Sequence, residues 1–391
     1  MQGFFTRRSA SRLTGGVAAT LLAGALLLSG CSGLRKPPPD KYVYVTAKAT
    51  YLRDRVAAVS NRTGNVSNGD KLTVLDHARR FVKVRSPRGE IGWIDEKAVA
   101  SQQVADDFAE LAKKHAKDPV VGNATVRDEV YMHDSPGRDT DRFFRLAEGD
   151  KLQLLARATL PKVATPGAAK PVPVKNAAGV EEIPPPVMED WWLVRNANAD
   201  TGWIYSRMID VDAPDTLARY AEGQRIVGAY ILTHVNDPES GQLRDGQPDP
   251  DIPIYVTVLG PYKAGLPYDF DQVRVFTWNL KKHRYETAMR EKNIEGYLPV
   301  KIGTSKDPYG KSVDAQNPLP SFTYRVLAAD APTPVPDPIT GVVTPGKLIE
   351  KTYRLIGNIT QRIAQPGVPP PAVAHPTPEQ DKKDAKKKRK K

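Results

Sequence analysis

The chain has 391 residues, which is enough for two or three domains with hydrophobic cores, and its formal net charge is +12. A single cysteine excludes a disulfide within the chain. The six histidines are scattered, and neither a Gly-rich phosphate loop nor a nucleophile-elbow serine appears, so the sequence predicts no catalytic residue, no metal ligand and no cofactor.

The first 30 residues have the pattern of a targeting segment rather than of a folded element. Arginines precede an apolar run at residues 15–28, which is shorter than the roughly 20 residues of a membrane span. The run ends in "LSGC", and this ending resembles the signal of bacterial lipoproteins. The resemblance implies cleavage before Cys31 and acylation of its thiol and new amine, with residues 31–40 as a proline-rich tether. An ordinary secretory signal with a coincidental cysteine is the alternative.

An acylated Cys31 has consequences for chemistry and for location. It leaves no free thiol for a cysteine nucleophile or a cysteine metal ligand. It also predicts a protein of the bacterial cell envelope that is held to a membrane by lipid. Ser32 in place of an aspartate resembles outer-membrane sorting signals, which implies the outer membrane, facing the periplasm, in a Gram-negative host.

Two parts of the chain repeat the same series of short motifs. "GDKLTVL", "FVKVR" and "GWI" occur in this order at residues 69–75, 81–85 and 92–94, and "GDKLQLL", "WWLVR" and "GWI" occur at 149–155, 191–195 and 202–204. Apolar and polar residues alternate in these runs, and Gly-Asp pairs mark turns between them. Several short strands within about 60 residues predict a small β-barrel or sandwich.

The order of these motifs resembles the bacterial SH3 domain, a small β-barrel that is common in envelope proteins. The resemblance implies one copy at residues 41–100 and a second at 119–212, the second with a proline-rich insertion at 157–187 that is expected to be an exposed loop. The second copy also contains "MHDSPG", which is close to a loop motif of that family, whereas the first copy departs from it. Two linked copies favour a binding module, because the linkage of weak sites raises avidity.

The aromatic residues of the two copies are the candidate ligand contacts. Trp93 and Trp203 each follow a glycine near the end of a copy, and packing in the core is their favoured interpretation. The other candidates lie in the second copy and are Trp191, Tyr131 and His133.

Residues 101–118, between the two copies, have the pattern of a helix. Val104, Phe108 and Leu111 recur at helical spacing, and Glu110 and Lys114 form an i,i+4 pair. We expect a short amphipathic helix that packs between the two copies.

Residues 213–364 are expected to form a β-rich domain whose family the sequence does not identify. "RVFTWNL-KKH-RYETAMR" at residues 274–290 predicts a hairpin, and "FTYRVLA" and "KTYRLIG", at 322–328 and 351–357, predict neighbouring strands.

Two groups of residues in this domain are candidate metal ligands. Four aspartates share a loop rich in Gly and Pro, but Asp-Pro and Asp-Gly pairs are ordinary turn formers, which is the favoured interpretation. These aspartates are Asp237, Asp245, Asp249 and Asp251. His283 and Glu286 have the spacing of some zinc ligands but fall in the predicted turn, where a solvated histidine is favoured.

The last segment, residues 365–391, is expected to be a disordered basic tail. Residues 379–391 hold eight cations and three acids, which is a net charge of +5. Such a run attracts polyanions, for example phospholipid headgroups or acidic glycans, and the alternative is a solvated tail without a partner. The candidate polyanion contacts are Lys382, Lys383, Lys386, Lys387, Lys388, Arg389, Lys390 and Lys391.

The predicted fold class is mainly β, with two small SH3-like barrels in tandem followed by a β-rich domain. These features together favour a lipid-anchored, non-catalytic envelope protein that binds peptidoglycan or an envelope protein. The alternatives are a cell-wall-modifying enzyme that uses carboxylates of the C-terminal domain, and a structural assembly factor with protein partners only. The expected partners include the membrane, through the lipid, and anionic polymers, through the tail; nucleic acid is not expected for an exported protein.

Overall fold

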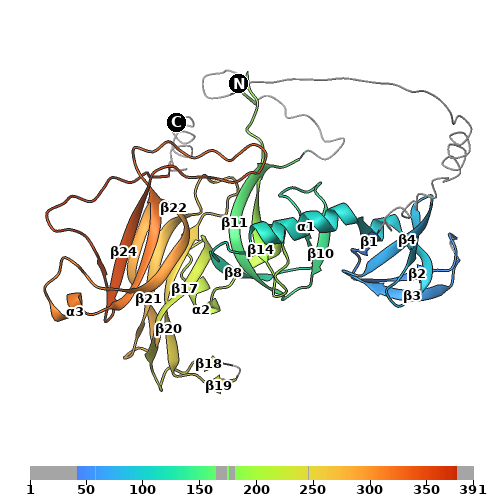
Figure 1. Cartoon of the computed structure of the whole chain (residues 1–391). Coiled ribbons are helices and arrows are strands. Elements are labelled where there is room, and N and C mark those ends of the chain that lie inside the picture. Colours follow the sequence, from blue (N-terminus) through green and yellow to red (C-terminus); the bar gives the residue numbers. More distant parts are fainter. Residues whose placement is uncertain (1–41, 58, 164–173, 176–180, 245, 377–391) are drawn as a thin grey trace, which may run out of the picture. The chain divides into compact units, whose positions relative to one another are not determined.

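The computed structural model describes residues 42–57, 59–163, 174–175, 181–244 and 246–376, and all of them belong to one compact unit that begins at Tyr42. The described chain is mainly β, as predicted, with three seven-stranded sheets (Figure 1). Its α-helices are α1 (Gln102–Lys114), α2 (Asp215–Ala218) and α3 (Val313–Gln316), and its short 3-10 helices are η1 (Glu96–Ala98) and η2 (Ser206–Met208). No helix of this part of the chain is long and apolar enough to cross a membrane. The predicted signal, Cys31, the tether and the lysine-rich end of the tail lie outside the described residues.

The first sheet contains residues 42–101 in the strand order β3-β2-β6-β5-β4-β1-β7. Its strands are β1 (Tyr42–Val45), β2 (Ala49–Arg53), β3 (Arg62–Ser67), β4 (Lys71–Ala78), β5 (Phe81–Arg85), β6 (Ile91–Asp95) and β7 (Val99–Ser101). Alternate residues point into a small core, because successive side chains of a strand lie on opposite faces. The core residues are Val45, Leu52, Val66, Leu72, Val82, Val84 and Ile94.

The second sheet has the same topology, in the strand order β10-β9-β15-β14-β11-β8-β16. Its strands are β8 (Gly122–Val126), β9 (Val130–His133), β10 (Arg142–Leu146), β11 (Lys151–Pro161), β14 (Met188–Arg195), β15 (Thr201–Tyr205) and β16 (Ile209–Val211). The buried counterparts of the first core are Val126, Met132, Leu146, Leu152, Trp192, Val194 and Ile204. Both sheets also shift register at the same place, between Val74 and Asp76 in β4 and between Leu154 and Ala156 in β11.

The recurring Gly-Trp-Ile triplet has a steric cause. A Cβ on Gly92 would lie 2.7 Å from the Cβ of Leu52, and a Cβ on Gly202 would lie 2.7 Å from the Cβ of Met132. β6 therefore approaches β2, and β15 approaches β9, so closely that only glycine fits. The motif returns because the same close approach returns.

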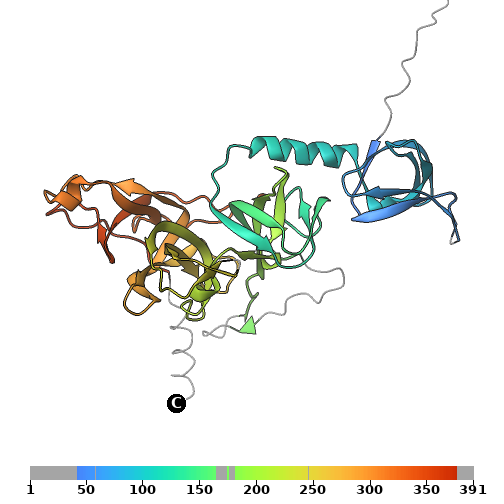
Figure 2. The same ribbon diagram turned by 90° about the horizontal axis from the view of Figure 1, so that it is seen from below.

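The helix α1 connects the first two sheets, and Figure 2 shows it alongside the second. Phe108 is 1% exposed, and its ring centroid lies 5.5 Å from that of Phe144. Leu111 packs against the buried cluster that includes Trp203. The helix also contacts the first sheet, where the Tyr44 hydroxyl donates to the side chain of Gln102 (3.1 Å). It thus lies between the two sheets as predicted, but its most buried residue belongs to the core of the second.

The segment expected to be an exposed loop, residues 157–187, is in part a strand. Residues 157–161 extend β11 and pair with β14, with Pro161 opposite Met188. Ala158 and Thr159 are both 0% exposed. A strand that is covered on both faces shows no two-residue alternation, and for this reason the sequence pattern did not reveal it. Further along are two short paired strands, β12 (Val174–Lys175) and β13 (Glu181–Glu182).

The third sheet contains residues 225–362 in the strand order β17-β20-β21-β22-β23-β24-β25. Its strands are β17 (Arg225–Asn236), β20 (Asp251–Gly260), β21 (Phe270–Asn279), β22 (Arg284–Ser305), β23 (Leu319–Leu327), β24 (Leu348–Ile356) and β25 (Ile359–Arg362), and a separate pair is β18 (Leu243–Arg244) and β19 (Gln247–Pro248). The predicted hairpin is confirmed, since Trp278 of β21 lies opposite Tyr285 of β22. The two similar segments pair as predicted, with Thr323 of β23 opposite Thr352 of β24.

The chain after β25 differs from the sequence-based expectation. The sequence predicts a disordered tail from residue 365, but residues 365–376 are placed, and some of them lie along the end of β23. The amide of Ala374 donates to the carbonyl of Leu327 (2.9 Å), and the amide of Ala329 donates to the carbonyl of Ala372 (3.0 Å). Val373, between these two bonds, packs against the core. A prediction based on composition did not detect this pairing, because it depends on a single apolar residue, Val373, beside the end of β23.

Candidate functional site

The outer face of the first sheet carries a row of cationic and aromatic side chains on four neighbouring strands. Trp93 of β6 lies opposite Lys83 of β5 and opposite Arg53 of β2, and Arg53 lies opposite Arg62 of β3. Directly opposed residues point to the same face of a sheet. Since Leu52, the neighbour of Arg53 in β2, points into the core, this row points outward.

Cations of this row lie over aromatic rings. The Lys83 ammonium is 5.8 Å from the ring centroid of Trp93, and the guanidinium carbons of Arg62 and Arg53 are 4.3 Å and 5.1 Å from that of Tyr51. Each such contact is worth about 0.5–1 kcal/mol at an exposed site. We refer to Tyr51, Arg53, Arg62, Lys83 and Trp93 as the basic aromatic face.

The positive charge of the basic aromatic face is not neutralised by a neighbouring acid. Its five side chains are exposed or half-buried. In the described part of the chain, no carboxylate forms an ion pair, within 4.0 Å, with any of its three cations. Acids of the same sheet have other partners: Asp95 lies 3.7 Å from Arg80, and Asp54 lies 3.8 Å from Arg55.

The corresponding place on the second sheet is less charged and is covered. There Trp203 of β15 lies opposite Leu193 of β14 and opposite His133 of β9, so a leucine and a histidine replace a lysine and an arginine. Leu193, Trp203 and His133 are 0%, 6% and 9% exposed, and Leu111 of α1 packs against the cluster of the first two. On the second sheet, Leu111 of the connecting helix and Val342 of a distant segment therefore pack on the face that is open on the first.

His133 is held neutral by its surroundings. Its Nδ1 lies 2.8 Å from the hydroxyl of Thr140, and its ring packs edge-on against Trp191 with 5.1 Å between centroids. The Thr140 hydroxyl donates its own hydrogen to the carbonyl of Ser135 or Gly137, so Nδ1 of His133 carries the hydrogen of their contact. Burial lowers the pKa of His133 to about 4.

Protonation of His133 is expected to destabilise the second sheet in acid. Its pKa of about 4 in the folded chain lies below the roughly 6.5 of an unfolded chain, so the unfolded state binds the proton more tightly. The neutral His133 makes its full contribution to the free energy of unfolding above about pH 6.5. This contribution, on the order of 3 kcal/mol in total, is lost as the pH falls toward 4. Urea unfolding at about pH 7 and about pH 4.5 should show a smaller acid loss for His133→Gln than for the parent.

The control for this measurement is His77→Gln, which changes an exposed histidine of the first sheet. We expect its acid sensitivity to equal that of the parent. The same sensitivity in His133→Gln would contradict the assignment of a buried neutral imidazole.

The aromatic candidates predicted from the sequence lie in different environments. Trp191 and Trp203 are 2% and 6% exposed and share a buried cluster with His133 beside it, so core packing is confirmed for Trp203. Tyr131 is half-buried, and the guanidinium of Arg142 lies 5.7 Å from its ring centroid. Trp93 does not pack in the core, because its side chain points to the outer face of the sheet with that of Lys83, and it is half-buried there.

The sequence reasoning did not single out the residues that surround Trp93. Tyr51 and Arg53 occupy alternate positions of β2, and Lys83 lies between two core valines of β5. A signal for them exists, because the outward positions of a strand follow from its inward ones by the period of two.

Asp237, one of the four loop aspartates, and His283, of the His-Glu pair, contact each other beside the turn between β21 and β22. Asp237 accepts a hydrogen bond from the Trp278 indole (2.6 Å) and lies 2.8 Å from Nδ1 of His283. The indole hydrogen bond, together with the imidazole, lowers the pKa of Asp237. Glu286 instead accepts from the side-chain amide of Asn279 (2.9 Å). His283 and Glu286 therefore bind different partners.

The remaining aspartates of the loop are not brought together around a shared centre. Asp249 lies 2.8 Å from Arg244, and Asp251 is exposed at the start of β20. Asp245 is outside the described residues. Within the residues that are described, no group of three or more His, Cys, Asp or Glu side chains is placed to hold a metal ion.

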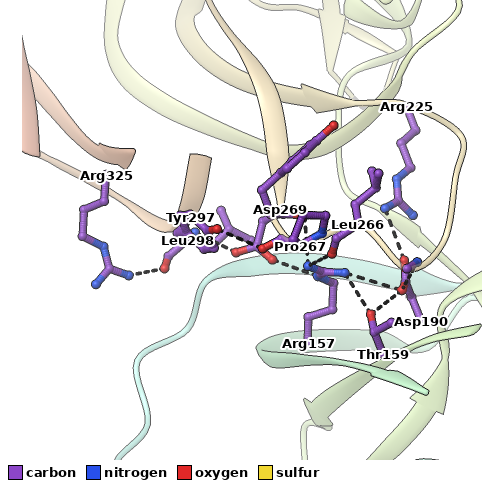
Figure 3. A network of polar contacts seen from close by, with 12 residues as sticks. Arg157, Thr159, Asp190, Arg225, Leu266, Pro267, Asp269, Tyr297, Leu298 and Arg325 are labelled. Carbon is purple, nitrogen blue, oxygen red and sulfur yellow. Dashed lines mark hydrogen bonds and ion pairs between the residues drawn. The ribbon is translucent and has the colours of Figure 1, made fainter. Parts of the chain in front are cut away.

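A buried ionic network joins the second sheet to the third (Figure 3). The side chain of Arg157, on the extended part of β11, is 5% exposed, and its Nε lies 2.8 Å from a carboxylate oxygen of Asp269. The same guanidinium donates to the carbonyls of Leu266 (3.0 Å) and Tyr268 (2.9 Å). Burial acts to lower the pKa of Arg157, but the two aspartates Asp269 and Asp190 outweigh it and raise the pKa above its ordinary value.

Asp190 of β14 completes the network from the side of the second sheet. It accepts hydrogen bonds from the Thr159 hydroxyl (2.6 Å) and from the amide of Gly265 (3.0 Å), and its other oxygen lies 3.7 Å from Arg225 of β17. Asp269 in turn accepts from the amide of Leu298 (2.9 Å). Each carboxylate thus has a cation and at least one donor, which is typical of a structural joint.

Comparison with known proteins identifies part of the first sheet. Residues 48–100 match the model of the bacterial SH3 domain, so this stretch is a bacterial SH3 domain. The match contains all five residues of the basic aromatic face. A search of the curated proteins found no match.

Solved structures with some similarity to this chain include NlpC and NlpC/P60 proteins. NlpC2 from Trichomonas vaginalis is 10% identical, with a TM-score of 0.14 over 47% of this chain and 54% of that one. An NlpC/P60 family protein from Bacillus cereus ATCC 10987 is 13% identical, with a TM-score of 0.21 over 50% of this chain and 65% of that one. The chain thus spans less than two thirds of either protein, and scores of this size carry no argument about it.

Proposed function

We propose that this protein is a lipid-anchored protein of the bacterial cell envelope that binds the peptidoglycan wall through its SH3 domain and does not act as an enzyme. The anchor would be Cys31, in the outer membrane of a Gram-negative host. The observation that carries the proposal is the basic aromatic face, an open surface of the SH3 domain with accessible rings and unneutralised cations. Domains of this type generally bind components of the cell wall.

We further propose that the second sheet is a second copy of the same domain. Its strand order, its register shift and its glycine at the close approach of two strands support this proposal. The two copies differ in what surrounds them, because Leu111 of α1 and Val342 pack on one face of the second copy and the extended β11–β14 hairpin contacts the third sheet. The second copy would then act as a scaffold between the binding domain and the C-terminal domain.

Co-sedimentation with purified sacculi tests the proposed function. The protein from Ser32 onward keeps every described residue, and a version that ends before Glu379 lacks the most basic part of the tail. At about 0.15 M salt, where long-range attraction between exposed charges is screened within about 8 Å, we expect both versions to sediment with sacculi and the shorter one to retain at least about half of the bound fraction.

Loss of sedimentation on removal of residues 379–391 would count against the proposal. The tail alone would then explain the attraction, and the assembly-factor function with protein partners would be favoured. Absence of binding by both versions would exclude the wall as the ligand.

A further inference from the structure

We propose that the basic aromatic face binds a linear acidic polysaccharide, with a sugar ring on Trp93 and carboxylates at Arg53, Arg62 and Lys83, while the Tyr51 ring supports the two guanidinium groups. This inference rests on the proposed function, because it names the class of ligand that the SH3 domain takes from the envelope.

The side chains of the face are arranged like the repeat of a polymer. Neighbouring strands of a sheet lie about 4.8 Å apart, so Lys83, Trp93, Arg53 and Arg62 follow one another across four strands in steps of about that size. A sugar unit of an extended polysaccharide advances by a similar distance. A chain laid across the strands therefore meets about one side chain per sugar.

Each kind of side chain on the face suits one part of an acidic sugar. A guanidinium forms paired hydrogen bonds with a carboxylate, and a lysine ammonium binds it as a point charge. The CH groups on one side of a sugar ring pack against the electron-rich face of an aromatic ring. Because Trp93 lies between Lys83 and Arg53 in the sheet, a sugar on its indole has a cation on either side.

The charge on the face is unfavourable without an external partner. Arg53 pairs with Arg62 next to a register shift of β2 and β3, and like charges in a cross-strand pair repel each other. On the second sheet the corresponding opposed pair is His133 and Arg142, and the pKa of His133 keeps it neutral. A bound anion would offset the repulsion that the first sheet retains.

Charged aromatic surfaces also bind single-stranded nucleic acid, on whose bases aromatic side chains stack. The predicted export of the chain favours the polysaccharide over the nucleic acid. An oligonucleotide is therefore included in the test as the competing ligand.

Polygalacturonate, a linear chain of uronic acids, is the probe, and its fully methyl-esterified form has the same rings without the charge. Affinities are measured for the protein from Ser32 onward, for the face variant Arg53→Gln/Arg62→Gln and for the control variant Arg142→Gln/Arg207→Gln. Both variants lose two charges and keep the tail, so non-specific attraction changes equally. We expect the ester to bind the parent at least about ten-fold more weakly than polygalacturonate does. The affinity of the face variant for polygalacturonate should fall by at least about ten-fold, and that of the control variant should stay within about two-fold of the parent.

Tryptophan fluorescence gives a second readout that does not depend on the arginine variants. Trp191, Trp192, Trp203 and Trp278 are 2%, 5%, 6% and 2% exposed, which leaves Trp93 as the accessible tryptophan of the five. Polygalacturonate should protect this residue from quenching by acrylamide. The protection should disappear in Trp93→Phe.

Equal affinities of the face and control variants would overturn the inference, and so would tighter binding of a single-stranded oligonucleotide through the same two arginines. Failure of the proposed function is recognised separately, by the absence of sedimentation with sacculi. A protein that sediments with sacculi but does not bind polygalacturonate keeps the proposed function and loses the inference.

Discussion

Replacement of Arg157 by methionine is expected to lower the free energy of unfolding of the joined second and third sheets by about 3–5 kcal/mol. The change removes the cation between Asp269 and Asp190 and leaves both carboxylates in place. Asp190 is 1% exposed, so its charge cannot be solvated by water instead. Methionine fills much of the space of the buried arginine side chain. The decrease in the free energy of unfolding therefore reflects the removed charge more than lost packing.

The matched control is Arg127→Met, which removes an arginine from a surface ion pair. Arg127 and its partner Asp210 are 57% and 60% exposed, and such pairs contribute about 0–1 kcal/mol. Denaturant midpoints measure both variants, and hydrogen exchange at the amides of Gly265 and Leu298, which donate to the two carboxylates, should accelerate only in Arg157→Met. Equal shifts in the two variants would show that the network does not hold the sheets together.

Replacement of Phe108 by alanine is expected to destabilise the second sheet by a similar amount, about 3–5 kcal/mol. Phe108 is 1% exposed, and its ring packs against those of Phe143 and Phe144, with centroids 5.7 Å and 5.5 Å away. The shortened side chain leaves a cavity and removes the largest apolar contact of α1. Trp203, which the helix helps to cover, should become more accessible to acrylamide.

Gln103→Ala on the exposed side of the same helix is the control. The Gln103 side chain is exposed and donates to the Asp107 carboxylate (2.7 Å), so its loss is expected to change stability by less than about 0.5 kcal/mol. If Phe108→Ala were as stable as this control, or if quenching of Trp203 did not increase, the helix would not be the cover of the second sheet.

The strands of both small sheets could be predicted because their requirements are local. The alternation of Val82 and Val84 with polar neighbours defines one inward face, and the Gly-Asp pairs mark the turns. The hairpin of β21 and β22 was predictable on the same grounds, since Trp278 and Tyr285 alternate correctly on either side of a polar turn.

Two parts of the fold could not be predicted from the local sequence, because distant segments of the chain bury or pair with them. The extension of β11 is buried on both faces, so Ala158 and Thr159 show no alternation. The pairing of Val373 with the end of β23 depends on a strand that ends about 45 residues earlier in the chain. Neither partner can be read from the local pattern.

By itself the sequence determined that one strand order occurs twice, because Gly92 and Gly202 and the inward apolar residues are requirements of the backbone at each copy. Only the tertiary structure decided which of the two small sheets keeps an open face. The helix α1 follows the first small sheet and precedes the second in the chain. Which of the two sheets its apolar side packs against depends on the side chains that each sheet presents. A cover over Lys83 would have to desolvate its charge, whereas Leu111 of α1 and Val342 bury apolar surface on the cluster of Leu193 and Trp203, so the second sheet is covered there and the first is left open.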